Sequence, residues 1–195
     1  MTVIKDGTGS GFLAKVGAKN DLHTRAITVA ELSYASTIGN AFQAEGEVVI
    51  LAAASGEQTV LVLINEGTEA LEIGNIFVST RIETDVAKVT VVKLYLGKVT
   101  ATGGTSKNAV NLNTGAVNVA DITLIENNPT IVGVDYKILE LYFQGGNNNS
   151  FNVPFDGGIV LQTGGSFRVG VTGAAAVTAG LTCDASFQFW QEINL

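Results

Sequence analysis

The residue types that usually carry catalysis are scarce in this chain. It contains one histidine, His23, and one cysteine, Cys183, far apart in the sequence. A catalytic triad or a histidine–cysteine metal site needs several such side chains converging on one point. Cys183 lies in an apolar, strand-like stretch, where we expect a small buried hydrophobic residue and not a nucleophile. Chemistry based on histidine or cysteine is therefore not predicted.

Carboxylate pairs are the remaining candidates, because two well-placed Asp or Glu side chains are enough to hydrolyse a glycosidic bond. The close pairs are Glu45/Glu47, Glu66/Glu69 and Glu83/Asp85. All three are predicted to lie near turns, where solvated charges are expected. We therefore predict that the protein is not an enzyme and has no catalytic residues.

The glycine-rich segments could hold phosphate or a cation. Gly7–Gly11 resembles a phosphate-binding loop, but such loops follow a strand and open a helix, and no such pattern surrounds it. Residues 147–149 and 156–158 offer oxygen ligands without the spacing of a calcium-binding EF-hand. Turn and loop chemistry explains these segments better. We predict no cofactor and no metal ion.

The bulk composition indicates a folded chain with an unusually apolar surface. Apolar residues make up 46% of the 195 residues and charged residues only 15%, against about 25% charged residues in a typical soluble domain. The mean hydropathy is +0.33. So little charge with so much apolar content favours burial of some surface against a partner, and self-association is the simplest way to achieve it. We expect a homo-oligomer.

Charge is distributed unevenly along the chain. The balance is +2 over residues 1–30, −8 over residues 31–85 and −1 over the remainder, for a net charge of −7. No basic stripe is present that could neutralise phosphates, so a nucleic-acid partner is not expected. The longest apolar run, Val48–Ala54, is far shorter than the roughly 20 residues of a bilayer span, and the N-terminus lacks a secretion signal. We predict cytoplasmic synthesis and no membrane partner.

From Glu47 onward, short β-type runs dominate the sequence. They recur every ten to fifteen residues and end at turn residues; they are 48–51, 59–64, 71–73, 76–79, 88–96, 121–125, 136–144, 158–162, 166–171, 177–182 and 185–191. The pair 71–73 and 76–79 is predicted to flank a turn at Gly74-Asn75. Residues 136–144 could also form a short helix, but their aromatics favour a strand. The spacing predicts an antiparallel all-β sandwich or barrel of about eight to ten strands and excludes a parallel α/β fold.

Residues 1–30 differ from the body in composition. Asp6–Gly11 cannot pack a core, whereas apolar residues and a basic charge balance follow it. We predict an extended N-terminal arm over residues 1–30, with a short hairpin turning at Asn20-Asp21, and a β-sandwich domain over residues 31–195. A basic arm could lie across the acidic face of a neighbouring subunit. The predicted partner-contacting residues are Phe12, Leu13, Lys15, Val16, Leu22 and Arg25.

The N-terminal segments resemble those of a known group of proteins. Asp6–Val16 and Asn20–Thr28 are similar to the N-termini of tailed-bacteriophage virion proteins, which join such an arm to a β-sandwich body. The body resembles the jelly-roll cement or decoration proteins of phage heads, with Asn111–Gly115 and Gly157–Val171 as the nearest matches. The arm resemblance covers most of residues 1–30, and the rest is an architectural likeness.

The resemblance implies a jelly roll in preference to an immunoglobulin-like sandwich. It also implies a non-enzymatic capsid decoration protein, made in the host cytoplasm, that binds the major capsid protein as a trimer on the capsid surface. The alternative is a tail, baseplate or fibre-associated protein that binds a receptor or glycan, because jelly rolls also serve as lectins. That alternative predicts exposed aromatics at loop tips, and Phe151 and Phe155 are the candidates.

Overall fold

The computed structural model describes residues 15–16, 22–23, 31–50, 56–82, 89–144, 149–173 and 181–191. The chain divides into two units, Met1–Ala30 and Glu31–Leu195. In the first unit, β1 (Lys15–Val16) pairs antiparallel with β2 (Leu22–His23), as the predicted hairpin requires. The turn predicted at Asn20-Asp21 lies outside the described residues.

The second unit consists of one described helix, α1 (Glu31–Ile38), and eleven described strands. The eight longest strands are β3 (Ala41–Ile50), β4 (Gln58–Asn65), β5 (Leu71–Ile82), β6 (Val89–Thr102), β10 (Thr130–Gln144), β11 (Asn149–Leu161), β12 (Ser166–Thr172) and β13 (Leu181–Gln191). Between β6 and β10 lie β7 (Thr105–Ser106), β8 (Val110–Asn111) and β9 (Ile122–Glu126).

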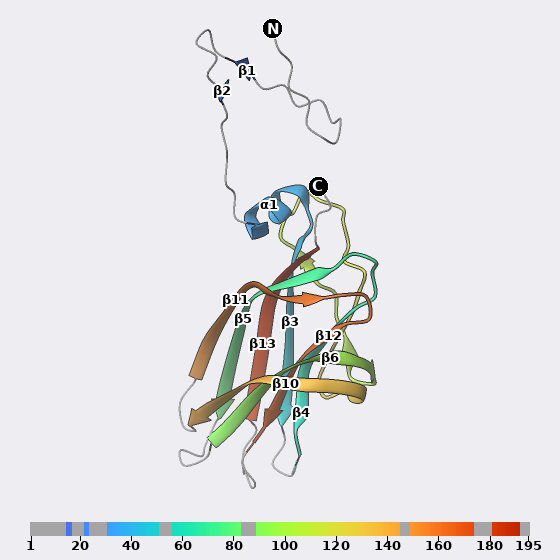
Figure 1. Cartoon of the computed structure of the whole chain (residues 1–195). Helices are drawn as coiled ribbons and strands as arrows, with labels where there is room; N and C mark the ends of the chain where they lie inside the picture. The colour runs from blue at the N-terminus through green and yellow to red at the C-terminus, as the bar shows by residue number, and fades with distance from the viewer. Residues whose placement is uncertain are drawn as a thin grey trace. The chain divides into compact units, whose positions relative to one another are not determined.

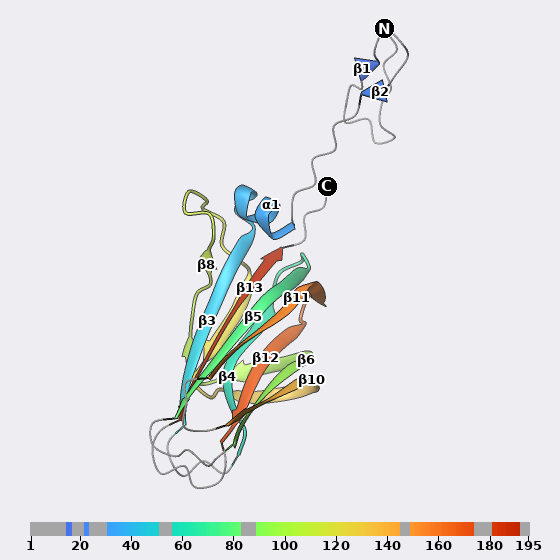
Figure 2. The same ribbon diagram turned by 90° about the vertical axis from the view of Figure 1, so that its left-hand side faces the viewer.

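The strand order is that of a jelly roll. β6 pairs with β10, β5 with β11, β4 with β12 and β3 with β13, all antiparallel, so the eight longer strands pair as one nested hairpin. This hairpin is rolled into a six-stranded sheet, β10-β6-β12-β4-β9-β7, and a five-stranded sheet, β11-β5-β13-β3-β8. The two sheets form the two layers of the sandwich (Figures 1 and 2). The predicted all-β, jelly-roll-like fold is thereby confirmed.

The core lies between the inner faces of the two sheets. Its centre contains aromatic rings from both layers, because Phe167 of β12 packs edge-on against Phe187 of β13 with ring centroids 5.4 Å apart. Phe42 stacks on Phe189 at 5.5 Å. Each of these four rings is 1% exposed or less. Aromatic pairs at these separations stabilise a core beyond the apolar area that they bury.

The last strand, β13, presents its side chains alternately to the core and to the opposite face. Phe187 and Phe189 point into the core. Trp190 lies on the opposite face, where it packs with Ala41 of β3 and Ala35 of α1. The sequence analysis did not predict α1. The helix has almost no apolar face, because among its described side chains Tyr34–Ile38 only Ala35 is buried and Ser36 is half-buried. Gly39 ends the helix in the left-handed region, at φ +80°, as helix C-termini commonly do.

Two local predictions were wrong. Residues 71–73 and 76–79 are parts of one strand, β5, with no turn between them. Gly74 is needed there for a different reason, since a Cβ at this position would lie 2.9 Å from the Trp190 ring. Glu45 and Glu47 lie inside β3 and not near a turn. The small inward-facing residues Ala44 and Gly46 alternate with these two carboxylates and conceal the strand pattern.

Candidate interaction surfaces

The predicted arm contacts are only partly described by the structure. Lys15 and Val16 lie on β1 and Leu22 on β2, with Val16 directly opposite Leu22 and Lys15 opposite His23. The remaining members of the predicted set, Phe12, Leu13 and Arg25, lie outside the described residues. Contact between any of the six and a partner therefore stays a prediction.

A buried ion cluster occupies the outer face of the six-stranded sheet. We call it the Arg168 cluster; it consists of Glu57, Lys93, Tyr95, Asp135 and Arg168. Arg168 is 8% exposed; its Nε donates to Asp135 Oδ2 and its Nη1 to Glu57 Oε1, both at 2.7 Å. Its guanidinium carbon lies 3.9 Å from the centre of the Tyr95 ring. Tyr95 and Lys93 both donate to Glu57 Oε2, at 2.5 and 3.2 Å.

The pKa shifts show that this cluster is electrostatically complete. Burial alone would raise the pKa of Glu57, but hydrogen bonds from Tyr95, Arg168 and Lys93 outweigh it and lower that pKa. Burial opposes the charge of Arg168, yet hydrogen bonds to Asp135 and Glu57 raise its pKa. Both partners are therefore held in their ionised forms. A cluster whose charges already satisfy one another positions strands and offers little to a ligand.

A second group of carboxylates lies along the edge of β3, where the Glu47 backbone N–H of the five-stranded sheet donates to Glu126 Oε2 of β9 in the six-stranded sheet, at 2.9 Å. We call it the acidic groove; it has a volume of about 320 Å³ and is lined by Glu45, Gly46, Glu47, Lys107, Glu126 and Asp184. Lys107 lies 3.1 Å from Glu126. A side-chain hydrogen bond with Asp184 raises the pKa of Glu47, and burial and the neighbouring carboxylates raise it further. No three His, Cys, Asp or Glu side chains in the described part of the chain are placed to hold a metal ion.

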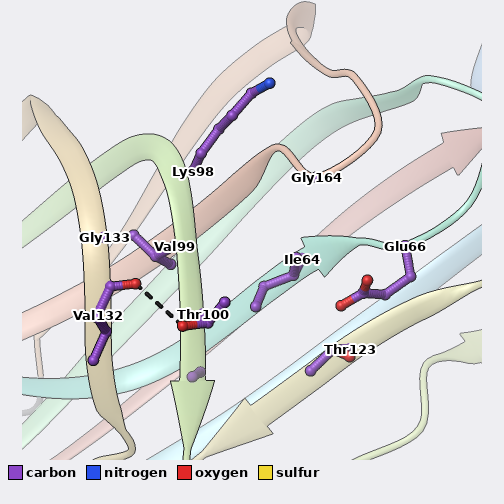
Figure 3. Close-up of a pocket in the computed structure, with 10 residues that line it drawn as sticks. Ile64, Glu66, Lys98, Val99, Thr100, Thr123, Val132, Gly133 and Gly164 are labelled. Carbon is purple, nitrogen blue, oxygen red and sulfur yellow. Dashed lines mark hydrogen bonds between the residues drawn. The ribbon is translucent and has the colours of Figure 1, made fainter.

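An apolar groove of about 540 Å³ lies next to Gly164, just before the first residue of β12. Its lining includes Ile64, Val99 and Val132, with Glu66 and Lys98 as its charged members. Figure 3 shows Val132 and Gly133 on one strand beside Val99 and Thr100 on the next, with Ile64 and Thr123 across the groove. The groove is open because β12 stops pairing with β6 at the Ser166–Gly97 pair.

The loop of residues 112–121, which we call the valine loop, presents two almost fully exposed aliphatic side chains. Val117 is 90% exposed and Val119 is 84% exposed. Asparagine side chains hold this loop against the end of α1. Asn111 Nδ2 donates to the carbonyls of Gly39 and Asn118, at 2.8 and 3.0 Å, and the remaining contacts are Asn113 Nδ2 to Thr37 O and Asn118 Nδ2 to Asn40 Oδ1, each at 3.0 Å. The two valines are therefore displayed on a backbone that is already ordered.

The sequence reasoning did not identify this loop as a contact surface. Asn111–Gly115 enters the sequence analysis only as part of the family resemblance. A usable signal was present, since Val117 and Val119 flank an asparagine in a stretch that is not among the predicted strands. Asparagines that cap turns at close spacing are a second signal of a fixed loop.

The exposed aromatic side chains are more numerous than predicted. Phe151 and Phe155, the candidates for aromatics at loop tips, both lie within β11 and not at a loop tip. Phe151 is 48% exposed, whereas Phe155 is half-buried and packs against the core. Phe77, Tyr136 and Tyr142 are also exposed, and none of the three was predicted to be.

The residues first considered for chemistry are not assembled into a site. Cys183 is fully buried, and burial raises the pKa of its thiol, which keeps it protonated and unreactive. Glu66 lies beside the apolar groove. Glu83 and Asp85 lie outside the described residues. No helix in the part of the chain that the structure describes is long and apolar enough to cross a bilayer.

Comparison with known proteins gives no family assignment. No protein-family model and no curated protein matches the chain. Among solved structures, the chain is similar to the empty head of turnip yellow mosaic virus, with 10% identity over 89% of this chain and 90% of the other and a TM-score of 0.27. It is also similar to a marine algae virus of the order Picornavirales, with 12% identity over 98% and 85% of the two chains and a TM-score of 0.26. Scores this low do not establish a common fold, so the architecture rests on the strand order itself.

Proposed function

We propose that this protein is a non-enzymatic structural protein of a virion, a capsid decoration protein that binds the surface of a phage head and stabilises it. Its partner is the major capsid protein, and the trimer expected from the family resemblance is part of the proposal. The valine loop is the observation that carries the proposal. Two aliphatic side chains on a pre-ordered loop would lose little conformational entropy on binding, which favours a docking role over a role in the fold.

Two other features support the proposal. The jelly roll is an architecture that viral capsid domains use repeatedly, although lectins use it too. The N-terminal segments also resemble those of tailed-phage virion proteins.

The test is binding of the purified chain to expanded phage heads, followed by co-sedimentation. We expect the V117D/V119D variant to lose binding, because two buried charges without partners oppose docking. The matched control adds the same charge at the exposed residues Thr102 and Ser106, as T102D/S106D, and should still bind. Equal binding by both variants would contradict a role for the valine loop.

The arm is tested separately by deleting residues 1–25. Loss of head binding with nearly unchanged thermal unfolding would assign the arm to partner contact. A large fall in melting temperature would instead show that the arm belongs to the fold. The copy number per virion then separates a head protein, present in hundreds of copies, from a tail or vertex protein, present in a handful.

A second candidate is a tail or fibre-associated protein that binds a receptor or glycan. The half-exposed Phe151 favours it, because aromatic rings stack on sugar faces. This function predicts binding to cells or glycan arrays that the F151A variant loses, together with no binding to expanded heads. Binding to heads that F151A leaves unchanged would exclude it.

A further inference from the structure

The outer strand of the six-stranded sheet, β10, is an unusually long free edge. It pairs with β6 over residues Thr130–Gln144, and no described strand pairs with it on the other side. Free edges present a row of unpaired backbone donors and acceptors, which other chains can pair with. Monomeric proteins protect such edges with charges, prolines or bulges. The presence or absence of such protection on β10 therefore indicates whether its free edge is an interface.

The first half of β10 exposes apolar side chains where protective charges would be expected. Val132, Val134 and Tyr136 alternate along one face and are 62%, 59% and 70% exposed. They lie opposite Thr100, Lys98 and Leu96 of β6. This part of the β6–β10 ribbon extends beyond the main core, which contacts β10 only from Leu139 onward, and only Ile131 packs against the smaller apolar cluster around Val99. An exposed alternating apolar row on a free edge is a pairing surface.

The charged residues of β10 are already neutralised within the chain. Asp135 accepts a hydrogen bond from the buried Arg168, and Lys137 forms an ion pair with Glu140. The register shift between Lys137 and Leu139 interrupts regular pairing beyond that point. The stretch whose register with β6 is continuous and whose charges are paired is Thr130–Lys137, with Gly133 at φ +133°; it is about 26 Å long at about 3.3 Å per residue.

We propose that two copies of this chain pair antiparallel through β10, with a two-fold axis at Val134. In this register, Val134 faces its own copy, and Val132 of each chain faces Tyr136 of the other. The pattern is complementary to itself, and pairs of aromatic and β-branched residues are among the favourable cross-strand pairs. The two six-stranded sheets then join into one continuous sheet, and both β10 edges are covered.

Charge does not oppose this contact. Lys98, which neighbours Val134 on β6, would lie three strand spacings from its copy, about 14 Å away, which is beyond the Debye length of about 8 Å at physiological salt. The inference concerns contact between two copies and does not depend on the proposed virion role. Because the contact is two-fold, it is distinct from the trimer expected from the family resemblance.

The first test is sedimentation of the full chain over a range of concentrations, alone and as the V134K variant. We expect the unaltered chain to dimerise and V134K to dissociate at least about ten times more readily, because two like charges would face each other across the axis. V110K is the matched control, since Val110 is 63% exposed on β8 of the other sheet, and it should dimerise like the unaltered chain.

The second test shows that any loss is due to pairing and not to misfolding. An equimolar mixture of V134K and V134E should dimerise where each variant alone does not, because opposite charges then face each other. The V134C variant should form a disulfide-linked dimer on oxidation, since directly opposed residues have Cα atoms about 4.5–5.5 Å apart, within disulfide range. V110C should not. A chain that stays monomeric, a trimer that V134K leaves intact, or V134C that fails to cross-link would each overturn the proposal.

Discussion

Two clusters of carboxylates, one on the outer face of the six-stranded sheet and one along the edge of β3, differ in the position of their cation. In the Arg168 cluster, the guanidinium lies between Glu57 and Asp135 and is almost fully buried. In the acidic groove, Lys107 lies at Glu126, and no described cation forms an ion pair with Glu47 or Asp184. The pKa of Glu57 is therefore lowered and that of Glu47 is raised.

The comparison separates a cluster that holds the fold together from one that weakens it slightly. A buried cation with two carboxylate partners is stable only as a complete set, because removal of one member leaves uncompensated charge. Neighbouring carboxylates on a strand surface repel each other, but water screens most of the repulsion. Mutations in the first cluster should therefore have large effects and mutations in the second small ones.

Replacement of the central cation should have the largest effect. R168M keeps much of the apolar stem but leaves Glu57 and Asp135 without their shared partner, so the free energy of unfolding should fall by about 3–5 kcal/mol. Urea denaturation measures this. K107M is the matched control in the acidic groove, where loss of a partly exposed ion pair should cost about 1 kcal/mol or less. Equal losses for the two variants would contradict the comparison.

The same cluster shows what the sequence could predict. Ser166–Val171 was predicted as a strand from its alternating pattern, and Arg168 lies within it. Its partners could not be predicted, because Glu57 and Asp135 lie 111 and 33 residues away and meet it only through the strand order. Local patterns reveal a strand, whereas contacts across a sheet depend on which strands become neighbours.

The acidic groove and the valine loop also depend on contacts between distant segments, which local sequence patterns do not reveal. Glu45 and Glu47 were assigned to a turn because Ala44 and Gly46 weaken the apolar alternation of β3. Burial of those small residues depends on Leu61 of the facing sheet, which lies 2.7 Å from the place of a Gly46 Cβ. The valine loop was missed because its rigidity comes from Asn111 bonding to Gly39, a contact between segments that are distant in sequence.

A methyl group inside the Arg168 cluster should have the next largest effect. A Cβ at Gly170 would lie 2.7 Å from Glu57 Oε1 and 3.1 Å from Arg168 Nη1, so G170A must displace the ion pair. We expect a loss of about 1–3 kcal/mol, as for other overpacked sites. G56A is the control, because a Cβ there meets no atom within 4 Å, and thermal unfolding of the two variants tests the difference.

The two clusters should also give stability opposite dependences on pH. Glu57 has a lowered pKa, so its contribution is present above the ordinary carboxyl pKa of 4.5 and is lost as the pH falls through the lower folded value. Glu47 has a raised pKa, so stability is gained as the pH falls from its folded value towards 4.5. E57Q should flatten the acid side of the stability profile and E47Q the side above 4.5. Identical profiles for both variants would contradict the assignment.

Relief of the repulsion in the acidic groove should have the smallest effect. D184N removes the like charge beside Glu47 and should raise stability at neutral pH by a few tenths of a kcal/mol, a size typical of exposed charge pairs. The gain is limited because Asp184 Oδ2 also accepts a hydrogen bond from Ser79 Oγ at 3.1 Å, which an asparagine oxygen would accept more weakly. The gain in stability should be largest at low salt and shrink at high salt, since screening weakens the repulsion that the substitution removes. A loss of stability at low salt would mean that the Ser79 hydrogen bond outweighs the repulsion, and that the acidic groove contributes to the fold after all.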